Sequence, residues 1–283
     1  MERGKEDCHI HMVLDGENWK TAIQRHENGP DLTWIRGILE QYANAGYDYL
    51  RDGGDRWGVG AAARSLAGEY GIRYRTPLAP LYHKGHYGSF IGVGFENVRE
   101  YRELVCKNRE KDFVKIMISG LMDFDRFGVL TQPGLSAGEI RELVHIAHEE
   151  GYAVMAHANG AEVVRAAAEA GVDSVEHGAY LDGEALHAMA ENGTVWVPTL
   201  STIGNLRGKG RFDETAVEQI LESAMENTSK FAAMGGLVAE GSDAGAWAVP
   251  HAAGTERTLL TQALGENVEE VLRRGGEKIR EKF

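Results

Sequence analysis

The 283-residue sequence alternates eight short apolar or β-branched runs with eight longer stretches of helical periodicity, a pattern that predicts an α/β fold. We interpret it as a single-domain (β/α)8 TIM barrel, for which this chain length is ordinary. No linker, low-complexity segment or shift in composition divides the chain, so one domain over residues 1–283 is the simplest organisation.

The predicted elements follow in order along the chain. The strands are expected at residues 7–12, 47–52, 72–78, 113–118, 152–157, 172–177, 194–199 and 237–243. The helices are expected at residues 31–45, 57–70, 96–110, 136–149, 160–170, 182–192, 214–234 and 254–273. Ser136 three residues before Glu139 predicts a capping box. Glycines that separate helices from strands predict left-handed helix ends at Gly46, Gly71, Gly151, Gly171 and Gly193.

Composition excludes several classes of function. The 30 Lys and Arg residues against 43 Asp and Glu residues leave a net charge of −13, which disfavours nucleic acid or an anionic membrane as a partner. No secretory leader and no run of about 18 apolar residues is apparent. Cys8 and Cys106 stand far apart in no metal or redox spacing, which suits a reducing compartment. We therefore expect a cytoplasmic protein.

Two strands carry unexpected polar side chains on one face. Residues two apart in a strand share a face, so His9 and His11 point together into the predicted barrel. Lys115 shares the inward face of its strand with Phe113 and Met117. A buried ammonium must lose its proton, find an anion or be modified. Reaction with carbon dioxide would make a carbamate, whose two oxygens can bridge two metal ions.

Three more potential ligands lie where predicted strands end. His157 ends the fifth strand, His177 the sixth and Asp243 the eighth, and a barrel collects these ends on one face. Each side chain alone is compatible with a structural role, but their coincidence favours a metal site. Imidazole and carboxylate suit zinc and similar ions, and six ligands can hold two ions about 3.5–4 Å apart. The sequence thus predicts a binuclear centre.

These ligand positions resemble those of the amidohydrolase superfamily. More narrowly, "DFVKIMISG", "YAVMAHANGAEVVRAAAEAGVDSVEHGAYLD" and "NGTVWVPTL" are similar to the branch of imidazolonepropionase-related proteins and metal-dependent prolidases. "LRDGGD" and "GHYG" resemble the ends of the second and third strands of that branch. The resemblance covers nearly the whole predicted barrel.

The resemblance implies roles for the ligands and a reaction. It implies that His9, His11 and Asp243 bind one metal ion, that His157 and His177 bind the other, and that carboxylated Lys115 bridges them. A metal-activated hydroxide would attack an amide carbonyl, with Asp243 as the proton shuttle. We expect a peptidase- or amidase-type hydrolase acting on a dipeptide or N-acyl amino acid, with two divalent ions, most simply zinc.

The chain departs from that family in one respect. Members usually carry a small β-sandwich built from both ends of the chain, whereas only six residues precede "DCHIH" here. The six ligands lie on barrel strands, so we expect the metal site to remain. The surface that the sandwich would cover suggests a homo-oligomer, or a chain truncated relative to the family.

The substrate pocket should form from loops that follow the strands. Its candidate residues are His83, His86, Tyr87, Tyr180, Arg207, Trp247 and His251. Arg207 is the candidate partner for a substrate carboxylate, because its guanidinium can bind such a group through two hydrogen bonds.

Two other interpretations keep the metal site but change its use. The substrate could be a cyclic amide or lactone opened at the same binuclear site. The chain could instead be a non-catalytic metal-binding barrel or a truncated family member. A deaminase is disfavoured, since deaminases of this superfamily commonly use one metal ion and need no bridging lysine.

Overall fold

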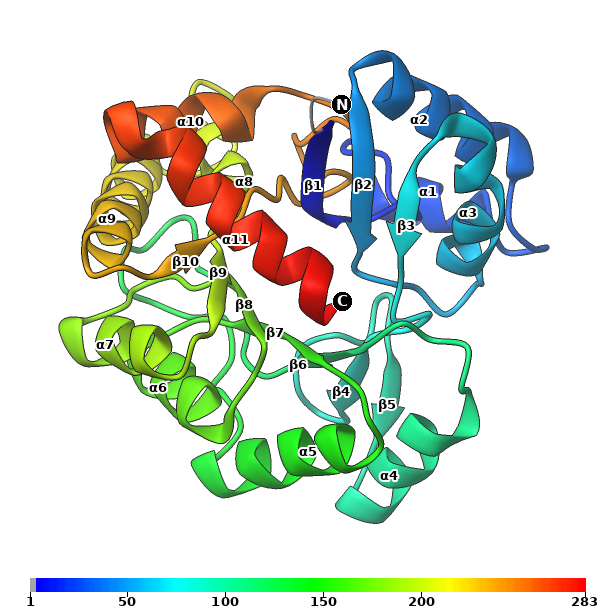
Figure 1. Ribbon diagram of the computed structural model, residues 1–283, viewed down its shortest axis with the longest axis horizontal. Coiled ribbons are helices and arrows are strands. Elements are labelled where there is room, and N and C mark those ends of the chain that lie inside the picture. Colours follow the sequence, from blue (N-terminus) through cyan, green and yellow to red (C-terminus); the bar gives the residue numbers. More distant parts are fainter. Residues whose placement is uncertain (1–3) are drawn as a thin grey trace.

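The computed structural model describes residues 4–283 (Figure 1). Its strands are β1 (Lys5–Ile10), β2 (Tyr47–Asp52), β3 (Arg73–Arg75), β4 (Leu81–His83), β5 (Val93–Phe95), β6 (Val114–Met117), β7 (Val154–Ala158), β8 (Ser174–His177), β9 (Val195–Val197) and β10 (Leu237–Val238). Its α-helices are α1 (Trp19–Gln24), α2 (Leu32–Asn44), α3 (Val59–Ala67), α4 (Val98–Lys107), α5 (Ala137–Glu149), α6 (Ala161–Ala170), α7 (Gly183–Glu191), α8 (Ser201–Gly204), α9 (Glu214–Ala233), α10 (Thr255–Leu264) and α11 (Val268–Lys282).

The strands form a ring of parallel pairs with helices outside it, as Figure 1 shows. One sheet has the order β1-β2-β3 and the other β10-β9-β8-β7-β6-β4-β5. Backbone hydrogen bonds join the two sheets at both seams. Cys8 N donates to Glu240 O (2.8 Å) and Asp243 N to His9 O (2.7 Å), while Asp112 N donates to Thr76 O (3.0 Å). The predicted (β/α)8 barrel is therefore confirmed.

The eight predicted strands correspond to β1, β2, β3, β6, β7, β8, β9 and β10. The prediction for the eighth strand was too long, because residues after Ala239 leave β9 and bond to β1 instead. The prediction of one continuous final helix at 254–273 was wrong, because the structure has two helices there. The helix breaks at Gly265, whose φ of 61° ends α10, and α11 then runs on to Lys282.

Local signals in the sequence match the structure closely. The capping box joins Ser136 and Glu139, with each side chain bonded to the backbone of the other residue. All five glycines predicted to end helices have positive φ. The sequence did not reveal β4 and β5, three-residue strands that lie between β3 and α4, or the short helices α1 and α8.

Helix α11 lies across the end of the barrel where the strands begin (Figure 1). Arg280 donates through Nε to Glu6 Oε2 (2.8 Å) and pairs with Asp48, and these two residues lie at the starts of β1 and β2. A Cβ on Gly275 would lie 1.9 Å from Val238 O, so only glycine permits this close approach. The helix thereby closes the bottom of the barrel.

Within residues 4–283 the structure contains no β-sandwich. The expected homo-oligomer stays a prediction. No helix among these residues combines the length and the apolar character that a membrane crossing requires.

Candidate metal centre

Three of the six predicted ligands form a compact group where β1 and β10 end. Ligand atoms of His9, His11 and Asp243 all lie within 4.8 Å of one another, and the three residues are buried. Asp243 Oδ1 lies 3.1 Å from His11 Nε2 and 3.4 Å from His9 Nε2. Both imidazoles thus turn a ring nitrogen toward the same carboxylate oxygen.

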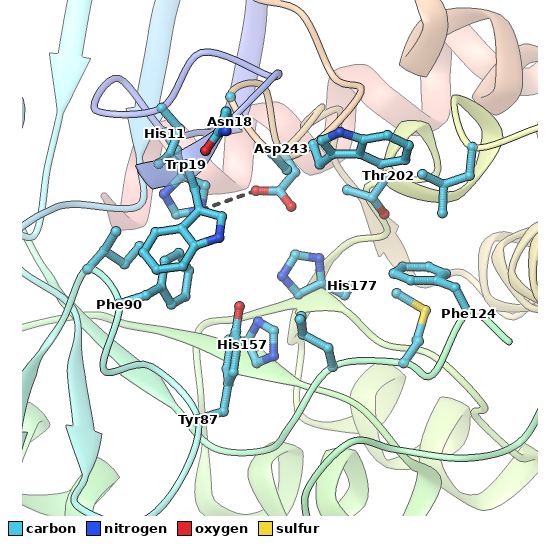
Figure 2. A pocket seen from close by; sticks show the side chains of 18 of the residues that line it. His11, Asn18, Trp19, Tyr87, Phe90, Phe124, His157, His177, Thr202 and Asp243 are labelled. Carbon is cyan, nitrogen blue, oxygen red and sulfur yellow. Dashed lines mark ion pairs between the residues drawn. The ribbon is translucent and has the colours of Figure 1, made fainter. Parts of the chain in front are cut away.

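The other three predicted ligands border this group. Lys115 is 1% exposed, and its Nζ lies 3.2 Å from His9 Nε2. The His177 ring centroid lies 5.1 Å from that of His9 and 4.6 Å from that of His157. Figure 2 shows His157, His177, His11 and Asp243 around one space. The structure therefore gathers all six side chains, drawn from five strands, at the carboxyl ends of the strands.

Hydrogen bonds to the far side of the imidazoles set which nitrogen faces the space. Glu176 Oε2 lies 2.7 Å from His9 Nδ1, and Thr199 Oγ1 lies 2.8 Å from His177 Nδ1. Each contact leaves Nε2 for the site. His157 is reversed, because its Nε2 faces Gly120 O at 3.4 Å and leaves Nδ1. Partners of this kind orient metal-binding histidines.

Glu176 belongs to a fully buried ion pair under the site. Arg51 donates through Nη2 to Glu176 Oε1 (2.8 Å), through Nη1 to Ser174 Oγ (2.9 Å) and through Nε to Cys8 O (2.7 Å). Burial raises the pKa of Glu176, while Arg51 and the Ser174 hydroxyl oppose that rise. Sequence reasoning missed Glu176, although it directly precedes His177 on β8.

Burial also sets the charge of the potential ligands. Burial lowers the pKa of Lys115. Burial and the nearby charge of Lys115 also lower the pKa values of His9, His11 and His177, and they lower the pKa of His157 to about 3. Neutral imidazoles and a neutral amine are the forms that bind metal or react with carbon dioxide. Burial therefore favours the electron-donating forms of these nitrogens.

The backbone makes room for this group of donors. A Cβ on Gly53 would lie 2.3 Å from His11 Cε1 and 2.7 Å from Lys115 Nζ. His177 and Asp243 have φ values of 67° and 59°, in the left-handed region that residues other than glycine rarely adopt. Such strain is commonly found at functional sites.

Two buried polar atoms in this group lack hydrogen-bond partners in the part of the chain that the structure describes, and a bound metal ion would give one of them a partner. Asp243 Oδ1 and His11 Nδ1 are buried without a hydrogen-bond partner among the described residues. Buried acceptors without partners are costly, and a cation beside the carboxylate oxygen would remove that cost. Imidazole nitrogens with a carboxylate form a donor set typical of zinc.

The group opens into a cavity of about 630 Å³ with two aromatic walls. One wall contains Trp19, Phe90 and Tyr87, whose ring lies 5.0 Å from that of His157. The opposite wall includes Phe124, and Figure 2 shows it across the histidines from Trp19 and Phe90. Ring contacts extend that wall from Phe124 to Phe212, Trp247 and Arg211.

Two of the seven residues expected in the pocket line this cavity, Tyr87 and Trp247. His83 lies outside it, stacked between His86 and Phe95. His251 is buried, with Nε2 donating to Leu14 O at 2.9 Å, and therefore supports the first loop. Tyr180 packs edge-on against Phe127.

Arg207, the expected partner of a substrate carboxylate, also lies outside the cavity, 3.8 Å from Glu218. Arg211 in the same loop lines it instead. Neither periodicity nor a motif distinguishes these arginines, so only the conformation of the loop reveals the difference.

Comparison with known proteins agrees with the geometry. The Amidohydrolase family model matches residues 91–273, which include Lys115, His157, His177 and Asp243. The chain belongs to the amidohydrolase family. This amidohydrolase is 28% identical over 233 residues to ochratoxinase of Aspergillus niger, a match that covers 71% of the chain and 48% of ochratoxinase. An uncharacterized protein of Mycobacterium tuberculosis is 27% identical over 139 residues, covering 47% and 37% of the two chains.

The chain thus spans about half the length of the curated relatives it matches, or less. A solved Xaa-Pro dipeptidase with bound methionine in its active site matches this amidohydrolase with a TM-score of 0.79 and 21% identity, over 98% of this chain and 75% of the other. The crystal structure of A. niger ochratoxinase matches with a TM-score of 0.78 and 19% identity, over 98% and 71%. These structural matches support the barrel fold.

Proposed function

We propose that this amidohydrolase is a metal-dependent hydrolase of amide bonds in small molecules. One observation carries the proposal, the convergence of six buried donor side chains, of which all but His9 line one cavity. They are His9, His11, Lys115, His157, His177 and Asp243. Five of them offer nitrogen atoms and one offers a carboxylate, the chemistry that zinc and related ions prefer.

The proposed centre holds two divalent ions, most simply zinc. His9, His11 and Asp243 would hold one ion and His157 and His177 the other, with Lys115 carboxylated by carbon dioxide and shared between them. Bound ions of this kind activate water and polarise a carbonyl. The support from this chain is the pKa of Lys115, which burial lowers, and the space that Gly53 leaves beside its amine.

Asp243 is the residue proposed to move the proton. Its Oδ1 has no hydrogen-bond partner among the described residues, and its side chain borders the cavity. A carboxylate in this place can accept a proton from water and deliver it to the departing amine. His9 Nε2 and His11 Nε2 approach the same Oδ1 atom, at 3.4 and 3.1 Å, and help to position the carboxylate.

A dipeptide or an N-acyl amino acid is the proposed substrate. Support comes from the names of similar proteins, an ochratoxinase and an Xaa-Pro dipeptidase whose structure holds methionine. The cavity volume of about 630 Å³ also suits a molecule of this size. The aromatic walls would exclude bulk water from the reacting bond.

The test joins metal analysis to turnover. Purified protein supplied with Zn²⁺ and bicarbonate should bind two ions per chain and hydrolyse members of a panel of dipeptides and N-acyl amino acids. Lys115→Ala should lose at least one ion and most activity, and short carboxylic acids such as acetate should restore part of both. Lys111→Ala, at a lysine of the same chain outside the site, is the control.

Three results would contradict parts of this proposal. Protein that binds no metal would exclude the metal site, and unchanged metal content in Lys115→Ala would exclude the carbamate. Hydrolysis of lactones or cyclic amides alone would reassign the substrate while keeping the site.

A further inference from the structure

Arg211 is a cation at the cavity with no acidic partner. It lies in the loop between α8 and α9 and lines the cavity. Its guanidinium carbon lies 4.3 Å from the ring centroid of Trp247 and 5.2 Å from that of Phe212. Among residues 4–283 no carboxylate forms an ion pair with it. Its charge is therefore held by aromatic faces and stays available to a ligand.

The aromatic wall holds this arginine through three separate loops. The Phe212 ring lies 5.2 Å from that of Phe124, in the loop after β6, and 6.0 Å from that of Trp247, in the loop after β10. Asp213 N also donates to Asp125 Oδ1 at 2.9 Å, which joins the loop of Arg211 to the loop of Phe124. These contacts fix the backbone directly after the arginine, at Phe212 and Asp213.

The cavity is apolar on both sides of the donor group. On the far side, the rings of Trp19 and Phe90 lie 6.1 Å apart, and Phe90 lies 5.6 Å from Tyr87. Trp19 is 49% exposed, so this wall runs from the surface down to His157. A substrate whose scissile bond lies at the donor group would therefore place an apolar group against each wall.

We propose that Arg211 binds the carboxylate of the substrate, and that the preferred substrates are N-acyl amino acids with large apolar groups on both sides of the amide. This inference rests on the proposed amide hydrolysis and specifies its substrate class. A guanidinium held against two rings presents its nitrogens to a carboxylate and forms charge-assisted hydrogen bonds with it. A neutral amide of the same shape would lack that interaction.

The other cation at the cavity is a weaker candidate for this role. Lys20 lies 5.5 Å from the Trp19 ring and, like Arg211, is exposed, but Glu17 lines the same side of the cavity. An acid on that side disfavours an anionic group there. The carboxylate is accordingly assigned to the Arg211 side, and the acyl group to the wall of Trp19 and Phe90.

The experiment separates binding from turnover by using three probes. N-benzyl-L-phenylalanine cannot be hydrolysed, because a methylene replaces its acyl carbonyl, and calorimetry on the metal-loaded protein gives its Kd. N-benzoyl-L-phenylalanine and N-benzoyl-2-phenylethylamine are cleavable and differ only in the carboxylate. Arg211→Gln should weaken binding of the first probe about ten- to one-hundredfold, the range for a hydrogen bond to a charged group.

In turnover, Arg211→Gln should raise KM for N-benzoyl-L-phenylalanine by a similar factor and leave kcat nearly unchanged. The neutral amide should respond little, and Arg211→Lys should restore part of the affinity. Arg207→Gln is the matched control, because Arg207 lies in the same loop but outside the cavity.

The outcomes distinguish this inference from the proposed function. If wild-type protein hydrolyses amides but Arg211→Gln behaves like Arg207→Gln, or affects charged and neutral substrates equally, Arg211 does not bind the carboxylate. If N-acetylglycine is cleaved as well as N-benzoyl-L-phenylalanine, the apolar walls do not select substrates. If no amide is hydrolysed while N-benzyl-L-phenylalanine still binds through Arg211, the site is confirmed and the proposed reaction is wrong.

Discussion

Glu176 and His9 lie 2.7 Å apart between Oε2 and Nδ1, and both side chains are completely buried beneath the proposed metal centre. The carboxylate accepts the Nδ1 proton and so leaves the His9 Nε2 lone pair directed at the site. Arg51 balances the charge of Glu176 from the opposite side. The orientation of one ligand thus depends on an ion pair inside the barrel.

Glu176→Gln should weaken zinc binding by about ten- to one-hundredfold, the range known for partners of metal-binding histidines. Glutamine keeps the size of the side chain but loses the charge, and it leaves Arg51 uncompensated. Titration against a fluorescent zinc chelator measures the effect. Glu184→Gln is the control, because Glu184 pairs with Arg165 on the surface of the barrel. Equal zinc affinities in the two variants would show that Glu176 has no such role.

Gly53→Ala should abolish metal binding while the barrel still folds. The added Cβ would overlap with His11 Cε1 at 2.3 Å and Lys115 Nζ at 2.7 Å, so both side chains must move. Metal analysis and circular dichroism measure the two effects separately. The matched control is Gly37→Ala within α2, where a Cβ meets nothing within 4 Å and helix propensity predicts a gain of about 1 kcal/mol. Full metal content in Gly53→Ala would contradict the steric argument.

Removal of metal should lower the thermal stability of the protein. Ligand that binds only the folded state contributes about 2.7 kcal/mol at a hundredfold excess over Kd. For a chain of this size we therefore expect chelation to lower Tm by at least about 5 °C. Calorimetry with and without a chelator measures it, and the loss should be absent in Gly53→Ala. An unchanged Tm in wild-type protein would argue against a tightly bound ion.

Phe283→Ala should destabilise the barrel through its lower end. The Phe283 ring packs edge-on against Phe113 (5.1 Å) and lies 4.4 Å from the Arg51 guanidinium carbon. Truncating a buried phenylalanine costs about 3–5 kcal/mol. Urea unfolding measures this cost, and Met234→Ala, at a side chain that is 46% exposed, should cost much less. Similar losses in both variants would mean that α11 contributes little to the barrel.

The sequence predicted the barrel because strand and helix periods alternate clearly and each strand ends near a recognisable signal. It also predicted that the six candidate ligands would lie together, since parallel strands in a barrel end on one face. Their role in binding metal remains a prediction. Alternation placed Lys115 inward, and the structure places it against His9.

Loops limited the rest of the prediction. Arg207 and Arg211 have equivalent sequence surroundings, and their exposure to the cavity depends on how α8 turns the chain after β9. The role of Glu176 could not be predicted from the sequence, because it adjoins the more recognisable ligand His177 and because its partner Arg51 lies 125 residues away in the sequence. The aromatic residues of the two walls come from separate loops and share no period.

The His9 and Asp243 pair joins opposite ends of the sequence, and so does the hydrogen bond that Ser242 N donates to the Asp7 carboxylate across 235 residues. These contacts form only after the last strand has closed on the first. A folding intermediate in which the last strand has not yet paired with the first would therefore lack the assembled group of six candidate ligands. The amount of metal bound during refolding would therefore measure the fraction of closed barrels. Its rate would give the rate of barrel closure, which depends on contacts between residues far apart in the sequence.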